Sequence, residues 1–98
     1  MKSKTMVDFD QWLVRRLKSK KFKAAYEQAD EDPYINVALQ IIRLREENHL
    51  TQAQLAKRVK TSQQAIARME SLSYRGLTMD SLDRIARAMH KRVVIQFV

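Results

Sequence analysis

Three side chains with hydrogen-bonding chemistry stand close together in the second half of the sequence: Gln63, Gln64 and Arg68. A glutamine amide carries a donor and an acceptor, which match the N6 and N7 atoms of adenine in a two-bond contact. Arginine can bind O6 and N7 of guanine in the same way, or a phosphate. In a helix, Arg68 lies one turn beyond Gln64 on the same face. The alternative interpretation is an ordinary solvated surface.

The surrounding residues predict two short helices that would position these side chains. Thr51 is a candidate N-cap for the first helix, and Thr61 or Ser62 for the second. Only about three residues, 59–61, separate the helices, which predicts a sharp crossing and a helix-turn-helix from about Leu50 to Glu70. The inward positions of both helices are apolar: Leu55, Ala56 and Val59, then Ala65, Ile66 and Met69.

The charge of the chain is positive and unevenly distributed. The formal net charge is +8, from 19 Lys and Arg against 11 Asp and Glu. Cations dominate residues 1–23 and 51–76, whereas residues 27–32 are acidic. A basic surplus attracts polyanions, and DNA releases counterions for each phosphate that a cation neutralises. Charge alone is equally compatible with a soluble protein that happens to be basic.

Length and composition predict one compact, mostly helical domain. The chain has 98 residues, 45% of them apolar, with a single glycine and a single proline. It has no cysteine, which excludes disulfides and thiolate metal sites. We find neither a run of eighteen apolar residues nor a secretory signal, and we expect a cytoplasmic protein without membrane contact.

Other elements follow from capping and periodicity. Residues 8–29 read as two short helices with a bend near Ser19, or as one long helix. Asp32 and Pro33 begin a helix that should end near Asn48 and His49, with Asn48 the more ready to adopt a left-handed conformation. After a loop over residues 71–77, Thr78 begins the last helix. Residues 92–98 are β-branched and aromatic, which is typical of a strand.

The segment from Thr51 to Glu70 resembles the XRE/Cro-type helix-turn-helix of lambdoid phage repressors. The likeness rests on Thr51-Gln52, Leu55-Ala56, Ile66 and Glu70 at their spacing, and it covers about residues 35–89. It implies an all-α fold: a compact five-helix lambda-repressor-like domain over residues 33–90. Residues 1–32 would be an N-terminal helical extension, and residues 91–98 a short C-terminal β-strand. The implied function is a sequence-specific, DNA-binding transcriptional repressor.

The resemblance also implies roles for individual residues. Gln63, Gln64 and Arg68 would read bases, because the N-terminal part of a recognition helix faces base edges. Arg45 and Glu70 would form a structural ion pair. The family usually has glycine at the turn where this chain has Lys60, and a positive φ there would cost about 1 kcal/mol. The expected DNA-backbone contacts are Gln52, Lys60, Ser62, Tyr74 and Arg75, with a solvated loop as the alternative for the last two.

The two ends of the chain predict partners. Val93, Ile95 and Phe97 share one strand face, which favours pairing with another chain and a homodimer on a palindromic operator. The alternative is a loose or internally packed terminus. The N-terminal pattern of Phe9, Trp12, Leu13, Phe22 and Tyr26 resembles the leader of HigA-type antitoxins. That likeness implies a RelE-like toxin as partner and autorepression of the shared operon. Alternatively, these aromatic residues simply cover the first helix of the domain.

Other classes of function fit the sequence less well. The two histidines, His49 and His90, stand at predicted helix ends and not at metal-ligand spacing, and no glycine-rich phosphate loop is present. We therefore expect no enzyme, no metal and no cofactor. A stand-alone regulator without a toxin partner remains an alternative, as does a protein-interaction module with vestigial DNA binding.

Overall fold

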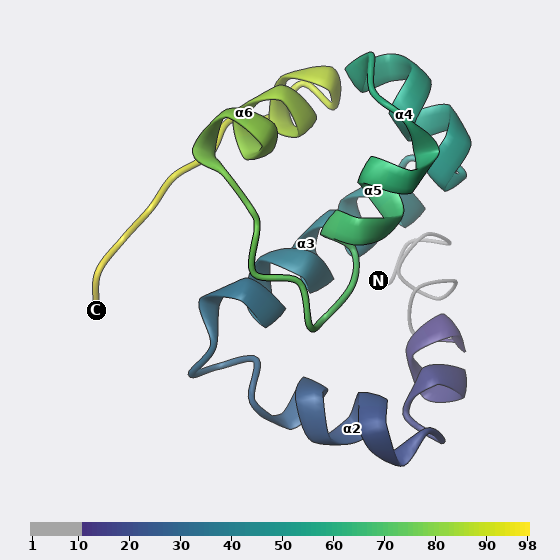
Figure 1. Cartoon of the computed structure of the whole chain (residues 1–98), viewed down its shortest axis with the longest axis vertical. Coiled ribbons are helices and arrows are strands. Elements are labelled where there is room, and N and C mark those ends of the chain that lie inside the picture. Colours follow the sequence, from purple (N-terminus) through teal and green to yellow (C-terminus); the bar gives the residue numbers. More distant parts are fainter. Residues whose placement is uncertain (1–10) are drawn as a thin grey trace, which may run out of the picture.

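The computed structural model describes residues 11–98, and the part of the chain that it describes is helical wherever it is regular (Figure 1). Residues 11–16 are helical, and α2 (Lys20–Glu27) follows after a short turn. Ser19 is the N-cap of α2, and its hydroxyl accepts from the Phe22 backbone N–H at 3.3 Å. The extension is therefore two helices with a bend at Ser19 and not one long helix, as the first of the two sequence interpretations predicts.

The longest helix, α3 (Pro33–Glu47), begins as the sequence predicts, and its last helical residue, Glu47, directly precedes the predicted end at Asn48 and His49. The Asp32 carboxylate accepts from the Tyr34 backbone N–H at 3.0 Å, and Pro33 takes the first helical position. At the other end, His49 and not Asn48 is left-handed, with φ 56°. The Asn48 side chain instead donates to the Leu44 carbonyl at 2.8 Å, which holds Asn48 on the helical side of the boundary.

Two short helices, α4 (Gln52–Val59) and α5 (Gln63–Met69), form the helix-turn-helix. Thr51 begins α4 with a complete capping box: its hydroxyl accepts from the Gln54 backbone, and the Gln54 side chain accepts from the Thr51 backbone. Ser62 is the cap of α5, since its hydroxyl accepts from the Ala65 N–H at 3.0 Å. The choice between Thr61 and Ser62 is thereby resolved.

The last helix is α6 (Met79–Ala88), with Thr78 as its N-cap. Residues 71–77, which contain Gly76, form a loop with no helix, and the chain leaves α6 through left-handed His90. Between residues 33 and 90 the structure therefore has four helices, α3 to α6, and the expected five-helix count is not confirmed. No helix within residues 11–98 has the length and apolarity needed to cross a membrane.

Apolar residues of α3, α4, α5 and α6 meet in one core, with α3 behind α5 in the view of Figure 1. Leu55 of α4 and Ile66 of α5 are its most deeply buried large side chains. Ile41 of α3 and Ile85 of α6 complete the contact from the other two helices. Because both short helices bury residues in a shared core, neither can change its angle without disturbing the other.

The expected C-terminal strand is not confirmed. Residues 91–98 have no regular secondary structure, and in Figure 1 they extend away from α6. A strand needs a partner for its N–H and C=O groups, and no segment within residues 11–98 supplies one. The tail leaves large apolar side chains in water: Val94 is 73% exposed, Ile95 59% and Phe97 96%. Pairing with a second chain stays a prediction.

Candidate nucleic-acid interface

The three candidate base-reading residues lie on the outer face of α5. Gln63, Gln64 and Arg68 are all exposed, whereas Ile66 is fully buried and Met69 is 8% exposed. Ala67 is also exposed and lies beside Arg68. A helix of only seven residues thus has a sharply divided surface, with an apolar side in the core and two amides and a guanidinium toward solvent.

The turn between α4 and α5 is built on a left-handed residue. Lys60 has φ 66° and ψ 49°, a left-handed conformation that glycine adopts more easily than a residue with a Cβ. The Thr61 N–H bonds to the Ala56 carbonyl at 2.9 Å, a bond typical of a Schellman helix end. From α6, Arg84 donates to the carbonyls of Val59 and Lys60 at 3.1 and 3.3 Å. These bonds fix the crossing of the two helices and leave the Lys60 side chain exposed.

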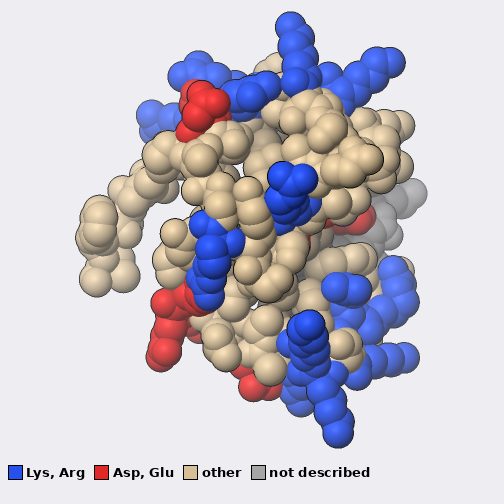
Figure 2. All heavy atoms as spheres, in the orientation of Figure 1, with Lys and Arg blue, Asp and Glu red and all other residues tan. Residues whose placement is uncertain are grey.

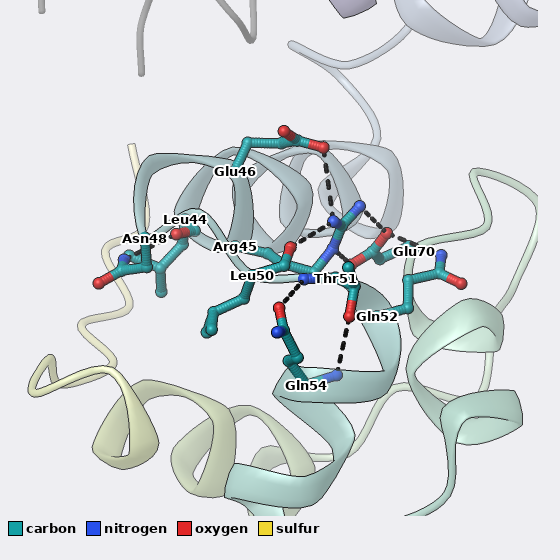
Figure 3. A network of polar contacts seen from close by, with 9 residues as sticks. All are labelled: Leu44, Arg45, Glu46, Asn48, Leu50, Thr51, Gln52, Gln54 and Glu70. Carbon is teal, nitrogen blue, oxygen red and sulfur yellow. Dashed lines mark hydrogen bonds and ion pairs between the residues drawn. The ribbon is translucent and has the colours of Figure 1, made fainter. Parts of the chain in front are cut away.

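A buried ion pair joins the end of α5 to α3 (Figure 3). Arg45 Nε lies 2.6 Å from Glu70 Oε2, and Nη2 lies 3.0 Å from Oε1, so the guanidinium binds the carboxylate with two bonds. Its remaining nitrogen, Nη1, donates to the Leu50 carbonyl at 2.8 Å. The two side chains are only 10% and 5% exposed. Burial by itself lowers the pKa of Arg45, but the hydrogen bonds and negative charges of Glu70 and Glu46 together outweigh it and leave that pKa raised.

Gln52, the expected phosphate clamp, belongs to the same network. Its Nε2 atom donates to Glu70 Oε1 at 3.1 Å, so the NH₂ group of the amide is held by the Glu70 carboxylate. Glu70 thus accepts from residues at the end of α3 and at the start of α4, and it is itself the C-cap of α5. One carboxylate therefore sets the relative position of three helix ends. Within residues 11–98, no buried side-chain nitrogen or oxygen lacks a hydrogen-bond partner.

Tyr74 and Arg75, expected to contact the DNA backbone, are engaged elsewhere. Tyr74 is half-buried against the core, and its ring lies over Gly76, where an added Cβ would collide with the hydroxyl oxygen. Arg75 binds both oxygens of Asp32 at 2.7 and 2.6 Å, and its guanidinium lies 4.8 Å from the centre of the Tyr34 ring. These contacts attach the loop to the first turn of α3. The hydrogen bonds from Arg75 lower the pKa of Asp32.

The aromatic residues of the extension contact one another. The rings of Trp12 and Phe22 meet edge-on at 5.8 Å, and those of Phe22 and Tyr26 stack at 6.3 Å. Phe22 is buried, whereas Trp12 and Tyr26 are half-buried, as is Leu13. These contacts are compatible with both interpretations of the aromatic pattern, as a cover for the first helix of the domain and as a contact for a partner. Phe9 lies outside the described residues.

Basic side chains gather in two parts of the face shown in Figure 2. One group follows the upper edge, over α4 and α6, and the other lies over the N-terminal helices at the lower right. Between these two groups, where α5 lies, the surface is mostly uncharged apart from isolated basic side chains. Cations on both sides of the reading surface suit a duplex, because phosphates line both sides of a groove.

Two contacts of the site had not been foreseen from the sequence. The bonds from Arg84 to the inter-helix turn span 25 and 24 residues, and the Asp32–Arg75 pair spans 43. Asp32 is recognisable as an N-cap, but no local pattern indicates that a distant arginine would bind the same carboxylate. Arg84 lies on the exposed side of the last helix, where charged residues are usually solvated.

Comparison with known proteins gives a family and no individual relative. No curated protein and no solved structure matches the chain. The family model of the helix-turn-helix matches residues 41–94, more than half of the sequence. The matched range includes Arg45, Gln52, all of α4 and α5, and Glu70. The chain therefore belongs to the XRE-type helix-turn-helix family of DNA-binding domains.

Proposed function

We propose that this chain is a sequence-specific transcriptional repressor that reads bases through Gln63, Gln64 and Arg68. The observation that carries the proposal is the exposure of all three on a short helix whose other side is buried. With the N-terminal part of α5 in the major groove, the two amides meet base edges, and each can make a two-bond contact with adenine. Arg68, one turn later, binds guanine or a phosphate.

The start of α4 provides the neighbouring backbone contact in this arrangement. The first N–H groups of a helix have no partner within the helix and attract a phosphate. Gln52 lies at this end, and its Nε2 is already anchored on Glu70 at 3.1 Å. Lys60 and Ser62, both exposed around the turn, are the further backbone contacts that we propose.

A homodimer would place two copies of α5 on successive major grooves of a palindromic operator, about 34 Å apart. The exposed tail supports a partner chain of this kind, because Val94, Ile95 and Phe97 have more than half of their surface in water. Two antiparallel tails would satisfy each other's backbone groups. Removal of residues 91–98 should then convert a dimer into a monomer in sedimentation measurements, and an unchanged mass would contradict the tail as dimer contact.

The test of the reading function compares the DNA upstream of the chain's own gene with a scrambled duplex. Gln63→Ala with Gln64→Ala should abolish the preference for the operator and leave non-specific affinity unchanged. A matched control is Gln40→Ala, an exposed amide on α3, which should leave both affinities unchanged. If the glutamine pair lowers affinity equally for both duplexes, the two amides do not read bases.

The more specific role that we propose is that of an antitoxin in a type II toxin–antitoxin module. In this role the chain neutralises a RelE-like toxin and represses its own operon. Support comes from the likeness of the N-terminal pattern to HigA-type leaders and from the exposed C-terminal tail. The experiment co-expresses the chain with the product of the adjacent reading frame: growth arrest by that product, relieved by this chain, is the expected result. Without such an effect, a stand-alone regulator is the better interpretation.

A further inference from the structure

A cleft of about 560 Å³ separates the N-terminal extension from the helix-turn-helix. Arg16 and Lys21 line it on the side of the extension. On the other side it is lined by Gln52, by Ala67 of α5 and by the Arg45–Glu70 pair. Because Ala67 and Gln52 both border the proposed DNA surface, the cleft adjoins that surface directly.

The charge of the cleft favours an anion. Its ionisable lining consists of three cations, Arg16, Lys21 and Arg45, and the carboxylate of Glu70. Both oxygens of that carboxylate are already bound, by Arg45 and by Gln52. Arg16 and Lys21 make no ion pair with another residue in the range 11–98, so their charges face the cleft uncompensated.

Arg16 is also held in place by the aromatic residues of the extension. Its guanidinium lies 4.9 Å from the centre of the Phe22 ring and 5.9 Å from that of Trp12. Contacts of this kind favour a cation over an aromatic face and restrict a long side chain without neutralising it. The buried Phe22 therefore helps to hold the guanidinium of Arg16 at this position in the cleft.

We propose that this cleft is a second DNA-backbone site, in which Arg16 and Lys21 each bind a phosphate of the duplex flanking the bases read by α5. The inference rests on the proposed function, since it places the same duplex across α5 and the extension. It assigns to the extension a role in affinity and not in base selection, because phosphate contacts carry no direct sequence information.

The experiment measures how the dissociation constant for operator DNA depends on salt. Each phosphate contact contributes about 0.9 to the slope of log affinity against log salt, so Arg16→Gln with Lys21→Gln should lower the slope by about 1.8. The fall should be the same on operator and scrambled duplexes, with the preference between them unchanged. Lys21→Gln alone, which leaves the aromatic contacts of Arg16 intact, should lower the slope by about 0.9.

The matched control is Lys18→Gln with Lys23→Gln, which removes the same charge from exposed positions of the same extension outside the cleft. This control should change the slope by less than half as much as the cleft variant. Equal slopes for the cleft variant and the unaltered chain would overturn the proposal and assign the cations to an acidic protein surface. Equal losses in both double variants would also overturn it, since the effect would then be net charge.

Failure of the proposed function gives a different pattern. A chain that does not distinguish operator from scrambled duplex fails as a sequence reader, yet the slope difference between the two double variants is still measurable on either duplex. Circular dichroism of each variant checks that the helical content is retained.

Discussion

Two ion pairs attach the surroundings of the recognition helix to the two ends of α3, and they differ mainly in their exposure to water. Arg45 and Glu70 meet near the C-terminal end of α3 with side chains 10% and 5% exposed. Asp32 and Arg75 meet at its N-terminal end, where the arginine is 57% exposed. The shortest nitrogen–oxygen distance is 2.6 Å in both pairs. The distance alone therefore does not show which of the two ion pairs contributes more to stability.

Burial changes what the loss of one partner does. A buried guanidinium without its carboxylate is a charge that water cannot reach, which costs about 3–5 kcal/mol. An exposed partner is simply rehydrated, and salt screens what attraction there was. We therefore propose that the Arg45–Glu70 pair sets the angle of α5, whereas the Asp32–Arg75 pair only holds a loop against α3.

The largest expected effect comes from Glu70→Ala. It leaves the buried Arg45 without its two-bond partner and Gln52 without its acceptor, and we expect the free energy of unfolding in urea to fall by about 3–5 kcal/mol. Glu46→Ala is the matched control, because Glu46 touches the same guanidinium only at 3.4 Å and is 28% exposed. Its effect should be much smaller. A loss below about 1 kcal/mol in Glu70→Ala would remove the difference between the two pairs.

An intermediate effect on the free energy of unfolding is expected from Lys60→Gly. It lies between the effects expected for the Arg45–Glu70 and Asp32–Arg75 pairs. Lys60 is left-handed at φ 66°, which costs a residue with a Cβ about 1 kcal/mol, so glycine should stabilise the domain by that amount. Lys57→Gly, in the last turn of α4 itself, should instead destabilise it by about 1 kcal/mol. Thermal or urea unfolding of both variants measures the contrast. Destabilisation by Lys60→Gly would show that its side chain has a structural role.

The smallest effect is expected from Asp32→Asn, which keeps an N-cap but removes the charge facing Arg75. Because the folded chain lowers the pKa of Asp32, the stabilisation is complete above the usual aspartate pKa of about 3.9. It is lost as the pH falls through the lowered value. Unfolding curves of the two chains should therefore differ slightly at neutral pH and converge in acid and in high salt. A difference that persists in strong salt would mean that this pair resembles the buried one.

Much of the fold could be predicted because its signals are local. Thr51, Asp32 and Thr78 cap helices through bonds to residues two or three positions away, and such bonds depend on a short stretch of sequence. Either Asn48 or His49 was expected to be left-handed, and the preference for Asn48 was wrong, because propensity favours asparagine whereas the side chain of Asn48 bonds back to Leu44. The predicted strand over residues 92–98 was not confirmed. A β-branched and aromatic pattern favours a strand, but it does not show which segment would pair with its backbone N–H and C=O groups.

The candidate site was predictable to the extent that it follows the family. The positions of Arg45 and Glu70 came from the resemblance, since nothing in a sequence brings residues 25 apart together. Arg75 lies in a loop where the chain departs from the family, and sequence alone left its partner open between DNA and water, whereas in the structure it binds Asp32. The sequence predicts that an arginine will bind an anion. Which anion it binds depends on the packing of distant segments, which the sequence does not show.

The exposed C-terminal tail has a consequence for how the protein behaves in solution at different salt concentrations. Its apolar side chains offer any copy of the chain a surface for association, and the net charge of +8 opposes the approach of a second copy. Salt screens that repulsion at the same time as it weakens the attraction to DNA. We therefore expect the salt concentrations that release the protein from a duplex to be those at which it most readily associates with itself.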